Sequence, residues 1–371
     1  MSGLASEPET GFRDARGPSR ADVSVQATGM DAIVSKFSAE KKGYFQDPFL
    51  KYFAPSSAQR RAPLINRGYY ARFKAIDTIV HRFLSTESSR KHQIVVLGGG
   101  VDTLFFRLAA NDKAFSEKAA VYDIDFKAVT KRKIETITTN EELRGLIDLT
   151  EGEMAELLQS DAPDSLHSTS YHAIPADLRD LPHLTETLQK SGIDGTAPTL
   201  FLSECVLVYM KAQFSDALIS WAGKNFNRGV FVTYEQILPN TQFGRVMIQN
   251  IERRGCPLHS IHKYPTLISL EQRYTSLGWS HCTALDMNQV YYDFLPKEDV
   301  VRVQRIELFD ELEEWHLIQG HYSISVAIND DILPQIGSGV AGTPAMGSEM
   351  VKSIAFTGKK DSPPPWFNKY R

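Results

Sequence analysis

The sequence has 371 residues, enough for one large globular unit with additions or for a core with tails. Its 41 basic and 45 acidic residues are mixed along the chain, and the net charge of -4 gives no reason to expect nucleic acid or an anionic membrane as a partner. No stretch reaches the length of a membrane span, and the N-terminal residues lack the apolar core of a signal peptide. The three cysteines are widely separated and offer neither a disulfide framework nor a zinc site. We therefore expect a cytoplasmic, monomeric protein without a bound metal.

The two ends of the chain differ in composition from its middle. Residues 1–27 are rich in Gly, Ser, Pro, Asp and Arg, and residues 331–371 contain many Pro and Gly residues. We expect both segments to be disordered tails around a folded unit over residues 28–330. No repeat of Kelch length is visible in the C-terminal segment.

The folded unit begins with a helical pattern. Residues 66–84 form an amphipathic helix whose apolar side carries Phe73, Ile76, Val80 and Phe83. This pattern predicts a helical subdomain, over residues 28–92, ahead of the rest of the unit.

An alternation of strands and helices follows over residues 93–238. Short apolar runs, each succeeded by a helical pattern, occur at residues 93–97, 120–124, 199–202 and 230–233. This alternation is typical of a parallel α/β sheet, and it predicts a Rossmann-like fold. A weaker run at residues 171–176 contains Pro175, which cannot donate to a neighbouring strand, so we expect it at a sheet edge.

The alternation stops after residue 238. Residues 240–254 and 298–315 read as amphipathic helices, the second with Val301, Leu308, Leu312 and Trp315 on its apolar face. Residues 281–285 and 322–328 alternate like strands and could pair as the last, partly antiparallel strands of the sheet. Residues 239–330 are therefore expected to hold lid helices and the last strands.

The first run ends in a glycine turn, Gly98-Gly99-Gly100, followed by a helix. Glycines let the backbone approach a ligand where a Cβ would clash. The dinucleotide fingerprint needs another glycine at position 103, where threonine stands, so a ligand without phosphates is favoured, and S-adenosylmethionine is the candidate. A structural tight turn without any ligand is the alternative that the turn alone leaves open.

Acidic residues follow the later strands. Asp125 ends the second run, where doubly wound folds place an acid on ribose hydroxyls, and Asp123 points to the same side of the strand. After the Pro175 run, Asp177 could accept from an adenine amino group while Leu178 covers the ring. Equally, Asp177 or Asp180 could cap the following helix.

Glu204 follows the strand that begins at residue 199, at the carboxyl edge of the sheet where open α/β folds bind ligands. A solvated loop glutamate is the alternative. Cys205 lies in an apolar run without a nearby histidine, so we interpret it as a buried structural thiol. His259 and His262 lack a third ligand at useful spacing, so no metal site is expected there.

Several ordered segments together resemble the leucine carboxyl methyltransferases. The resemblance runs from about residue 30 to 330 and rests on Lys36-Phe37, the 43–49 segment GYFQDPF, the 61–72 segment RAPLINRGYYAR, the glycine turn, the 176–180 segment ADLRD and the 203–206 segment SECV. The chain departs from this family in its long C-terminal segment and at Gly99, where a small residue such as alanine is expected. The related tRNA-modifying branch carries Kelch repeats after its methyltransferase unit.

The resemblance implies S-adenosylmethionine as cofactor and the C-terminal leucine carboxylate of the protein phosphatase 2A catalytic subunit as methyl acceptor. It implies that Arg72 and Tyr209 lie near the transferred methyl group. It also implies a cofactor site lined by Lys36, Arg72, Gly98, Asp125, Asp177, Leu178 and Glu204.

A carboxylate acceptor makes a distinct prediction about mechanism. A terminal carboxyl with a pKa of roughly 3.3 to 3.7 is already ionised at neutral pH, so no general base is needed. Buried cations are needed instead, and Lys36 and Arg72 are the candidates. Two alternatives stay open: a small-molecule methyltransferase, which would need a base for a hydroxyl, and a non-catalytic module that docks on the phosphatase.

Overall fold

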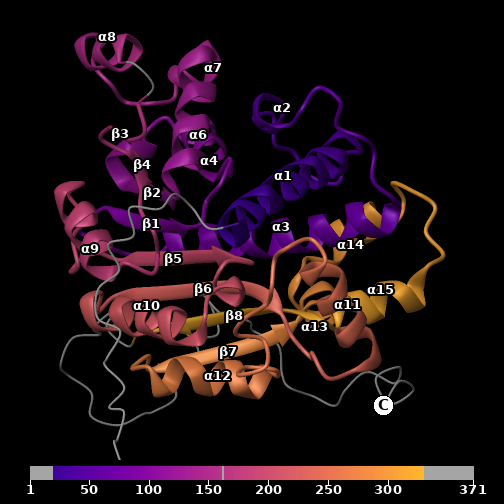
Figure 1. The fold of residues 1–371 in the computed structure, drawn as a ribbon. Coiled ribbons are helices and arrows are strands. Elements are labelled where there is room, and N and C mark those ends of the chain that lie inside the picture. Colours follow the sequence, from indigo (N-terminus) through magenta and orange to yellow (C-terminus); the bar gives the residue numbers. More distant parts are fainter. Residues whose placement is uncertain (1–19, 161–162, 330–371) are drawn as a thin grey trace, which may run out of the picture.

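The computed structural model describes residues 20–160 and 163–329, which form an eight-stranded sheet covered by helices (Figure 1). The strands lie in the order β3-β4-β2-β1-β5-β6-β8-β7. Their bounds are β1 His92–Leu97, β2 Ala119–Asp125, β3 Leu166–His167, β4 Tyr171–Pro175, β5 Thr199–Glu204, β6 Gly229–Gln236, β7 His281–Asp286 and β8 Tyr322–Ile328. The sheet is parallel from β4 to β6, and β8 runs antiparallel to both β6 and β7.

This topology confirms the predicted Rossmann-like α/β fold. The four strong runs form the adjacent central strands β2, β1, β5 and β6, and the two late runs form the antiparallel pair β7 and β8. Central parallel strands are covered by helices on both faces and so consist of continuous apolar residues. For this reason β1 and β6 are buried along their whole length.

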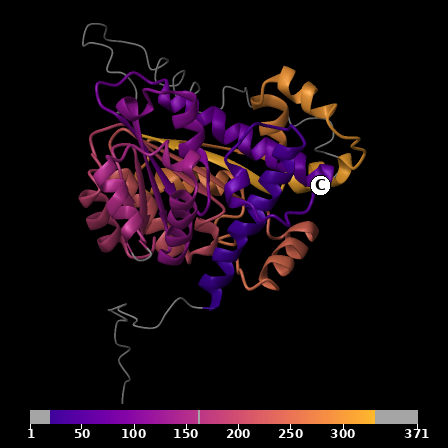
Figure 2. The same cartoon turned by 90° about the horizontal axis from the view of Figure 1, so that it is seen from above.

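The helices lie on both faces of the sheet and beyond its ends. Their bounds are α1 Arg20–Lys41, α2 Leu50–Phe53, α3 Pro63–Leu84, α4 Leu104–Asn111, α5 Phe115–Lys118, α6 Lys127–Thr139, α7 Glu141–Arg144, α8 Glu151–Gln159, α9 Leu181–Lys190, η1 Leu207–Tyr209, α10 Ala212–Asn225, α11 Gln242–Glu252, α12 Leu267–Ser276, α13 Met287–Gln289, η2 Val290–Phe294, α14 Lys297–Gln304 and α15 Leu312–Gln319. Seen from above, α1 crosses the molecule to reach the region of α11 (Figure 2). None of the described helices is long and apolar enough to span a membrane.

The strand with Pro175 is not the outermost one, so the prediction of an edge strand needs correction. The two-residue strand β3 pairs with β4 through Ala173 and His172 and takes the edge position. Pro175 lies beyond this short pairing at the end of β4. A proline is tolerated there because no outer strand requires its missing N–H.

The N-terminal segment expected to be disordered to residue 27 is helical from residue 20, where α1 begins. Two contacts explain the difference: Asp22 pairs with Arg179 at 3.0 Å, and Ser24 lies so close to Gly255 that a Cβ there would meet its Oγ at 2.7 Å. These partners are more than 150 residues away in sequence, so composition could not show them. The remaining residues of the two predicted tails, 1–19 and 331–371, lie outside the described residues.

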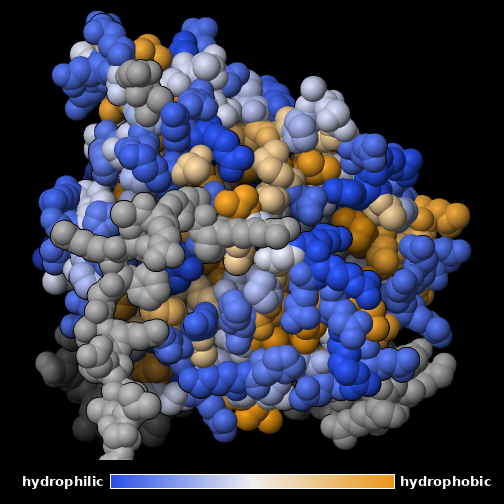
Figure 3. Space-filling model, viewed as in Figure 1, coloured by the Kyte–Doolittle hydropathy of each residue, from blue (hydrophilic) through white to orange (hydrophobic). Residues whose placement is uncertain are grey.

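The predicted helix over residues 298–315 is wrong, since α14 and α15 are separate and joined by a non-helical segment. Of its predicted apolar face only Trp315 is buried, whereas Leu308 is 92% exposed. The chain leaves the helical path between the two helices so that Glu307 can pair with Arg60 and Asn66. Figure 3 shows apolar groups at the margin where α14 and α15 lie.

Candidate active site

The candidate site lies at the carboxyl ends of β1, β2 and β5. Parallel strands bring their carboxyl ends to one edge, where helix starts and loops can approach a ligand. The turn after β1 contacts the segment after β5, because a Cβ on Gly98 would lie 2.6 Å from Val206 Cγ2. Gly98 also has a φ of 66°, which favours glycine. Only glycine satisfies both conditions at this position.

The carboxylates Asp123 and Asp125 on β2 have different surroundings. Asp123 accepts from Lys133 Nζ at 2.5 Å and from Tyr171 Oη at 2.8 Å, and both partners are buried. Asp125 accepts from the backbone amides of Gly100 and Phe126, each at 2.7 Å, and its carboxylate keeps further acceptor capacity. Asp125 is therefore the carboxylate that can bind hydroxyl groups at this edge.

Burial raises the pKa of the Asp125 carboxyl to about 6, although the amides of Phe126 and Gly100 and the charge of Lys133 act against it. Burial also raises the pKa of Asp123, opposed by Lys133. Asp125 is thus mainly ionised at neutral pH and protonated in mild acid.

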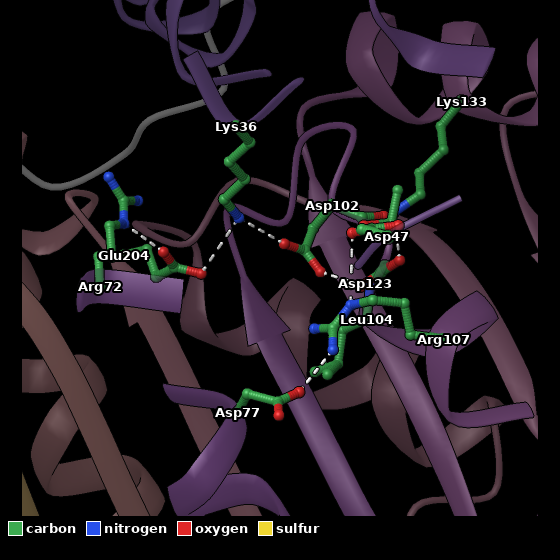
Figure 4. Close-up of polar contacts among 11 residues, drawn as sticks. Lys36, Asp47, Arg72, Asp77, Asp102, Leu104, Arg107, Asp123, Lys133 and Glu204 are labelled. Carbon is green, nitrogen blue, oxygen red and sulfur yellow. Dashed lines mark hydrogen bonds and ion pairs between the residues drawn. The ribbon is translucent and has the colours of Figure 1, made fainter. Parts of the chain in front are cut away.

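Lys36 of α1 lies between two carboxylates (Figure 4). Its Nζ is 3.0 Å from Asp102 Oδ2 and 3.7 Å from Glu204 Oε1. Glu204 also accepts from Nε of Arg72, which comes from α3. Two helices, one strand and the turn after β1 thus contribute two cations and two carboxylates to one buried group. We call it the central ion cluster: Lys36, Arg72, Asp102 and Glu204.

The charges of the central ion cluster stabilise one another. Burial alone would raise the pKa of Glu204, but Arg72 and Lys36 outweigh it and hold the pKa below its usual range. Burial likewise lowers the pKa of Lys36, yet Glu204 and Asp102 raise it above the ordinary value. All four groups are therefore charged at neutral pH, and Glu204 is not the solvated loop glutamate of the alternative interpretation.

The guanidinium of Arg72 is surrounded by tyrosines. Its carbon lies 4.5 Å from the ring centroid of Tyr234 and 5.7 Å from that of Tyr69. Tyr322 stacks on Tyr234 with 5.4 Å between the ring centroids, and Tyr209 and Tyr322 pack against the same apolar cluster. We call these four residues the tyrosine ring. It provides an apolar wall around a buried cation.

Tyr209 ends the short helix η1, which begins at Leu207, three residues after Glu204. Cys205 has a φ of 55°, unusual for a residue other than glycine, and its amide donates to Tyr234 O at 2.7 Å. Burial raises the pKa of the Cys205 thiol to about 12, so it is a neutral thiol and a poor nucleophile, as the sequence interpretation expected.

Asp177 and Leu178 lie beside the end of β2, since the amide of Ala176 donates to Asp125 O at 2.9 Å. Asp177 forms a two-point ion pair with Arg179, which also reaches Asp22 of α1. Asp180 caps α9 by accepting from the amide of His183. The two acids are thereby distinguished: Asp180 is the cap, and Asp177 is not.

Sequence reasoning missed several buried partners of the site residues. Asp102, Lys133 and Tyr171 were not singled out, and of the tyrosine ring only Tyr209 was. The position of Asp102 directly after the glycine turn was a usable signal, because it places a carboxylate at the helix start beside the ligand edge. The tyrosines carry no comparable signal, since a tyrosine in an apolar run is usually a core residue.

Comparisons with known proteins identify a family for this chain. The family model of leucine carboxyl methyltransferase matches residues 24–223. A leucine carboxyl methyltransferase 1 homolog of Arabidopsis thaliana is 39% identical over 313 residues, covering 83% of this chain and 90% of that protein. Leucine carboxyl methyltransferase 1 of Bos taurus is 36% identical, covering 82% and 89%.

A second kind of relative is also similar. The tRNA wybutosine-synthesizing protein 4 of Homo sapiens is 40% identical and covers 84% of this chain, which spans 45% of that protein. Among solved structures, a geranyl diphosphate C-methyltransferase from Streptomyces coelicolor A3(2) matches with a TM-score of 0.41 and 10% identity, over 85% of this chain and 99% of that one.

The fold, the glycine turn and the family match define the class of this protein: it is an S-adenosylmethionine-dependent methyltransferase. Within that class, the chain belongs to the leucine carboxyl methyltransferase family. The predicted family, enzyme class and cofactor are thereby confirmed.

Proposed function

We propose that this protein transfers a methyl group to the C-terminal leucine carboxylate of the protein phosphatase 2A catalytic subunit. The observation that carries the proposal is the placement of Arg72, a buried guanidinium between Glu204 and the tyrosine ring. A guanidinium presents several donors in a fixed fork that matches a carboxylate, and aromatic walls suit an aliphatic side chain. Together these features fit a peptide that ends in leucine.

Residues of this chain fit the cofactor in distinct ways. Gly98 lies so close to Val206 that no Cβ fits there, so the turn can present its backbone to the cofactor. Asp125 can accept hydrogen bonds from the two ribose hydroxyls. Lys36 suits the carboxylate of the methionine part. Asp177 and Leu178 suit the adenine amino group and ring. When bound, S-adenosylmethionine supplies an electrophilic methyl group.

The remaining work of the protein is positioning and charge compensation. Arg72 orients the acceptor carboxylate, and the tyrosine ring excludes water that would otherwise solvate it. The central ion cluster balances its own charges. The positive charge of the cofactor offsets the negative charge of the acceptor, so binding both adds no net charge to the site. After transfer both products are neutral at the reacting groups. Arg72 therefore loses the charge of the acceptor carboxylate and keeps only Glu204 as an anionic partner, which favours release of the ester.

The phosphatase surface could meet α11 and the residues after it. Arg245, Arg253 and Arg254 lie on or beside this helix. Arg245 donates to Asn240 O, Arg253 to Asn250, and Arg254 contacts Asp31 of α1. The guanidiniums are exposed and able to exchange these weak partners for acidic groups of a docking protein.

The second candidate is a role in tRNA modification, which the 40% identity to tRNA wybutosine-synthesizing protein 4 favours. The electrostatics support it less, because nucleic-acid binding needs an excess of positive charge and this chain carries a net charge of -4.

One experiment separates the candidates. Labelled methyl transfer is measured with purified phosphatase, with the same phosphatase lacking its last residue, with tRNA, and with a small-molecule extract. We expect label only in the intact phosphatase, in a base-labile ester. Label in tRNA or a small molecule would contradict the proposal, and binding to the phosphatase without label would indicate a non-catalytic module.

A further inference from the structure

A buried glutamate, Glu235, lies behind the segment that carries Tyr209. It stands on β6 and is 5% exposed. Its Oε1 accepts from the backbone amide of Val208, the middle residue of η1, at 2.7 Å. This contact joins residues 27 positions apart and connects the sheet to η1, which lies between Glu204 and α10.

Glu235 and its neighbour Tyr234 lie on opposite faces of the same strand. Successive residues of a strand point to opposite sides of the sheet. Tyr234 faces Arg72, with a distance of 4.5 Å from ring centroid to guanidinium carbon. Glu235, on the other face, holds η1. One strand thus contributes Tyr234 to the tyrosine ring and, from its other face, the contact that holds η1.

A second contact holds η1 from the opposite direction. Ser260, which follows α11 and is 2% exposed, donates its hydroxyl to Leu207 O and its amide to Val208 O, both at 3.2 Å. Cys205 precedes the turn with a φ of 55°. Such backbone conformations persist where the surroundings fix them. The segment is therefore clamped between the sheet and the region after α11.

Glu235 is an unexpected residue for this position. The guanidinium of Arg273 attracts it through space but donates its own N–H groups to Asp216 and Ser215. Burial raises the pKa of the Glu235 carboxyl to about 7, with Arg273 and the η1 amides acting against the rise. An apolar residue would avoid this penalty but would leave the Val208 amide without its acceptor.

We propose that Glu235 is a positioning residue that holds η1 against the sheet and so presents Tyr209 at the methyl-transfer end of the site. This inference rests on the proposed function for its kinetic part. It assigns Glu235 no contact with substrate or cofactor. Its effect passes through the Val208 amide to Tyr209, one residue further along the chain.

The test compares E235Q, which keeps an acceptor oxygen, with E235M, which keeps the length of the side chain and loses the acceptor. The matched control is E271M, because Glu271 also accepts a backbone amide, that of Ala284, away from the site. We expect E235M to lower kcat by about 10- to 100-fold, since small displacements of positioned groups have effects of that size. E235Q and E271M should keep near-normal kcat, and cofactor affinity should change by less than about threefold in all three.

Hydrogen exchange of the 205–210 segment provides a readout independent of activity. Exchange at Val208 should be faster in E235M and close to wild type in E235Q and E271M. Normal exchange and normal kcat in E235M would overturn the proposal, as would an equal loss of kcat in E235Q. If the wild-type chain does not methylate the phosphatase, the proposed function fails, and the exchange result still decides whether Glu235 positions η1. Should E235M fail to fold, S260A weakens the same clamp, and we expect faster exchange there too.

Discussion

Two groups of buried charges occupy the same edge of the sheet, and they are built differently. In the sealed pair, Lys133 and Asp123, the side chains are 2% and 8% exposed, and the buried Tyr171 also donates to the Asp123 carboxylate. In the central ion cluster, the side chains of Lys36, Arg72 and Glu204 are 11 to 15% exposed, and Arg72 lies against the rings of Tyr69 and Tyr234. The first arrangement suits a structural role, and the second leaves its charges reachable for a ligand.

The difference matters because a buried ion pair rarely stabilises a fold more than well-packed apolar side chains would. The sealed pair also holds the segment after the glycine turn, because Lys133 Nζ donates to Asp102 O at 2.7 Å. In the central ion cluster, an anionic group of a ligand can replace Asp102 or Glu204 as the partner of a cation. Variants in the sealed pair should therefore lose stability, whereas variants in the central ion cluster should lose activity.

The largest expected effect is on stability, in the sealed pair. Lys133→Met leaves Asp123 buried without its cation and should lower the free energy of unfolding by about 3 to 5 kcal/mol. Urea denaturation measures this effect. Lys127→Met is the control, because Lys127 lies on the same helix in an exposed pair with Asp164 and should change stability by less than about 1 kcal/mol. Equal losses in both variants would contradict a special role for the sealed pair.

In the central ion cluster the largest effect should be on catalysis. Arg72→Ala should reduce the maximal rate at saturating cofactor by about 100-fold, equivalent to about 2.7 kcal/mol, and Arg72→Lys should recover little because an ammonium lacks the fixed fork. Arg90→Ala, which breaks an exposed pair with Asp194 at the other end of the sheet, is the control. A near-normal maximal rate with weaker cofactor binding would assign Arg72 to the cofactor carboxylate alone.

A smaller effect is expected at Asp125, which ends the strand that carries Asp123. Asp125→Ala removes a charged acceptor for two hydroxyls and should weaken S-adenosylmethionine binding by about 1 to 3 kcal/mol in a calorimetric titration. Asp123 cannot replace it, since Lys133 and Tyr171 already occupy that carboxylate. An unchanged dissociation constant in a folded variant would move the ribose contact elsewhere.

The same carboxyl predicts a pH dependence. Its folded-state pKa of about 6 lies above the ordinary value of 3.8, so the folded protein binds this proton more tightly than the unfolded chain does. Its contribution to folding stability therefore decreases as pH rises between these two values. Cofactor affinity should do the reverse, rising as pH increases through 6 and levelling off above 7, because the ionised form accepts the hydroxyls. Asp125→Asn should flatten the titration, and a persistent slope in that variant would point to another group.

The smallest effect is expected at the exposed ion pair beside the site. Asp177 and Arg179 are each 37% exposed at their side chains, so Asp177→Ala should change the free energy of unfolding by at most about 1 kcal/mol. Cofactor affinity should nevertheless fall a few-fold if Asp177 binds the adenine amino group. Asp180→Ala is the control: it removes the cap of α9, which costs about 1 kcal/mol, and should leave cofactor affinity unchanged. Normal cofactor affinity in Asp177→Ala together with weaker affinity in Asp180→Ala would assign the adenine contact to Asp180 instead.

The order of strands and helices followed from the sequence because it depends on local patterns. Continuous apolar runs identified β1, β2, β5 and β6, and alternation identified β7 and β8. The pattern failed where a single distant partner redirected the chain. Glu307 breaks the predicted helix before α15 to reach Arg60, and Asp22 holds the start of α1 through Arg179.

The candidate site was only half visible in the sequence. Strand ends and the glycine turn marked Gly98, Asp125 and Glu204, because the carboxyl edge of a parallel sheet is where its loops meet. The family resemblance added Lys36 and Arg72 as members of one site. Their ion pairs join residues 66 to 168 positions apart, and the rest of the tyrosine ring and Glu235 come from three further elements, η1, β6 and β8. Only the tertiary structure decided these contacts, since burial makes each charge depend on partners that no local pattern specifies.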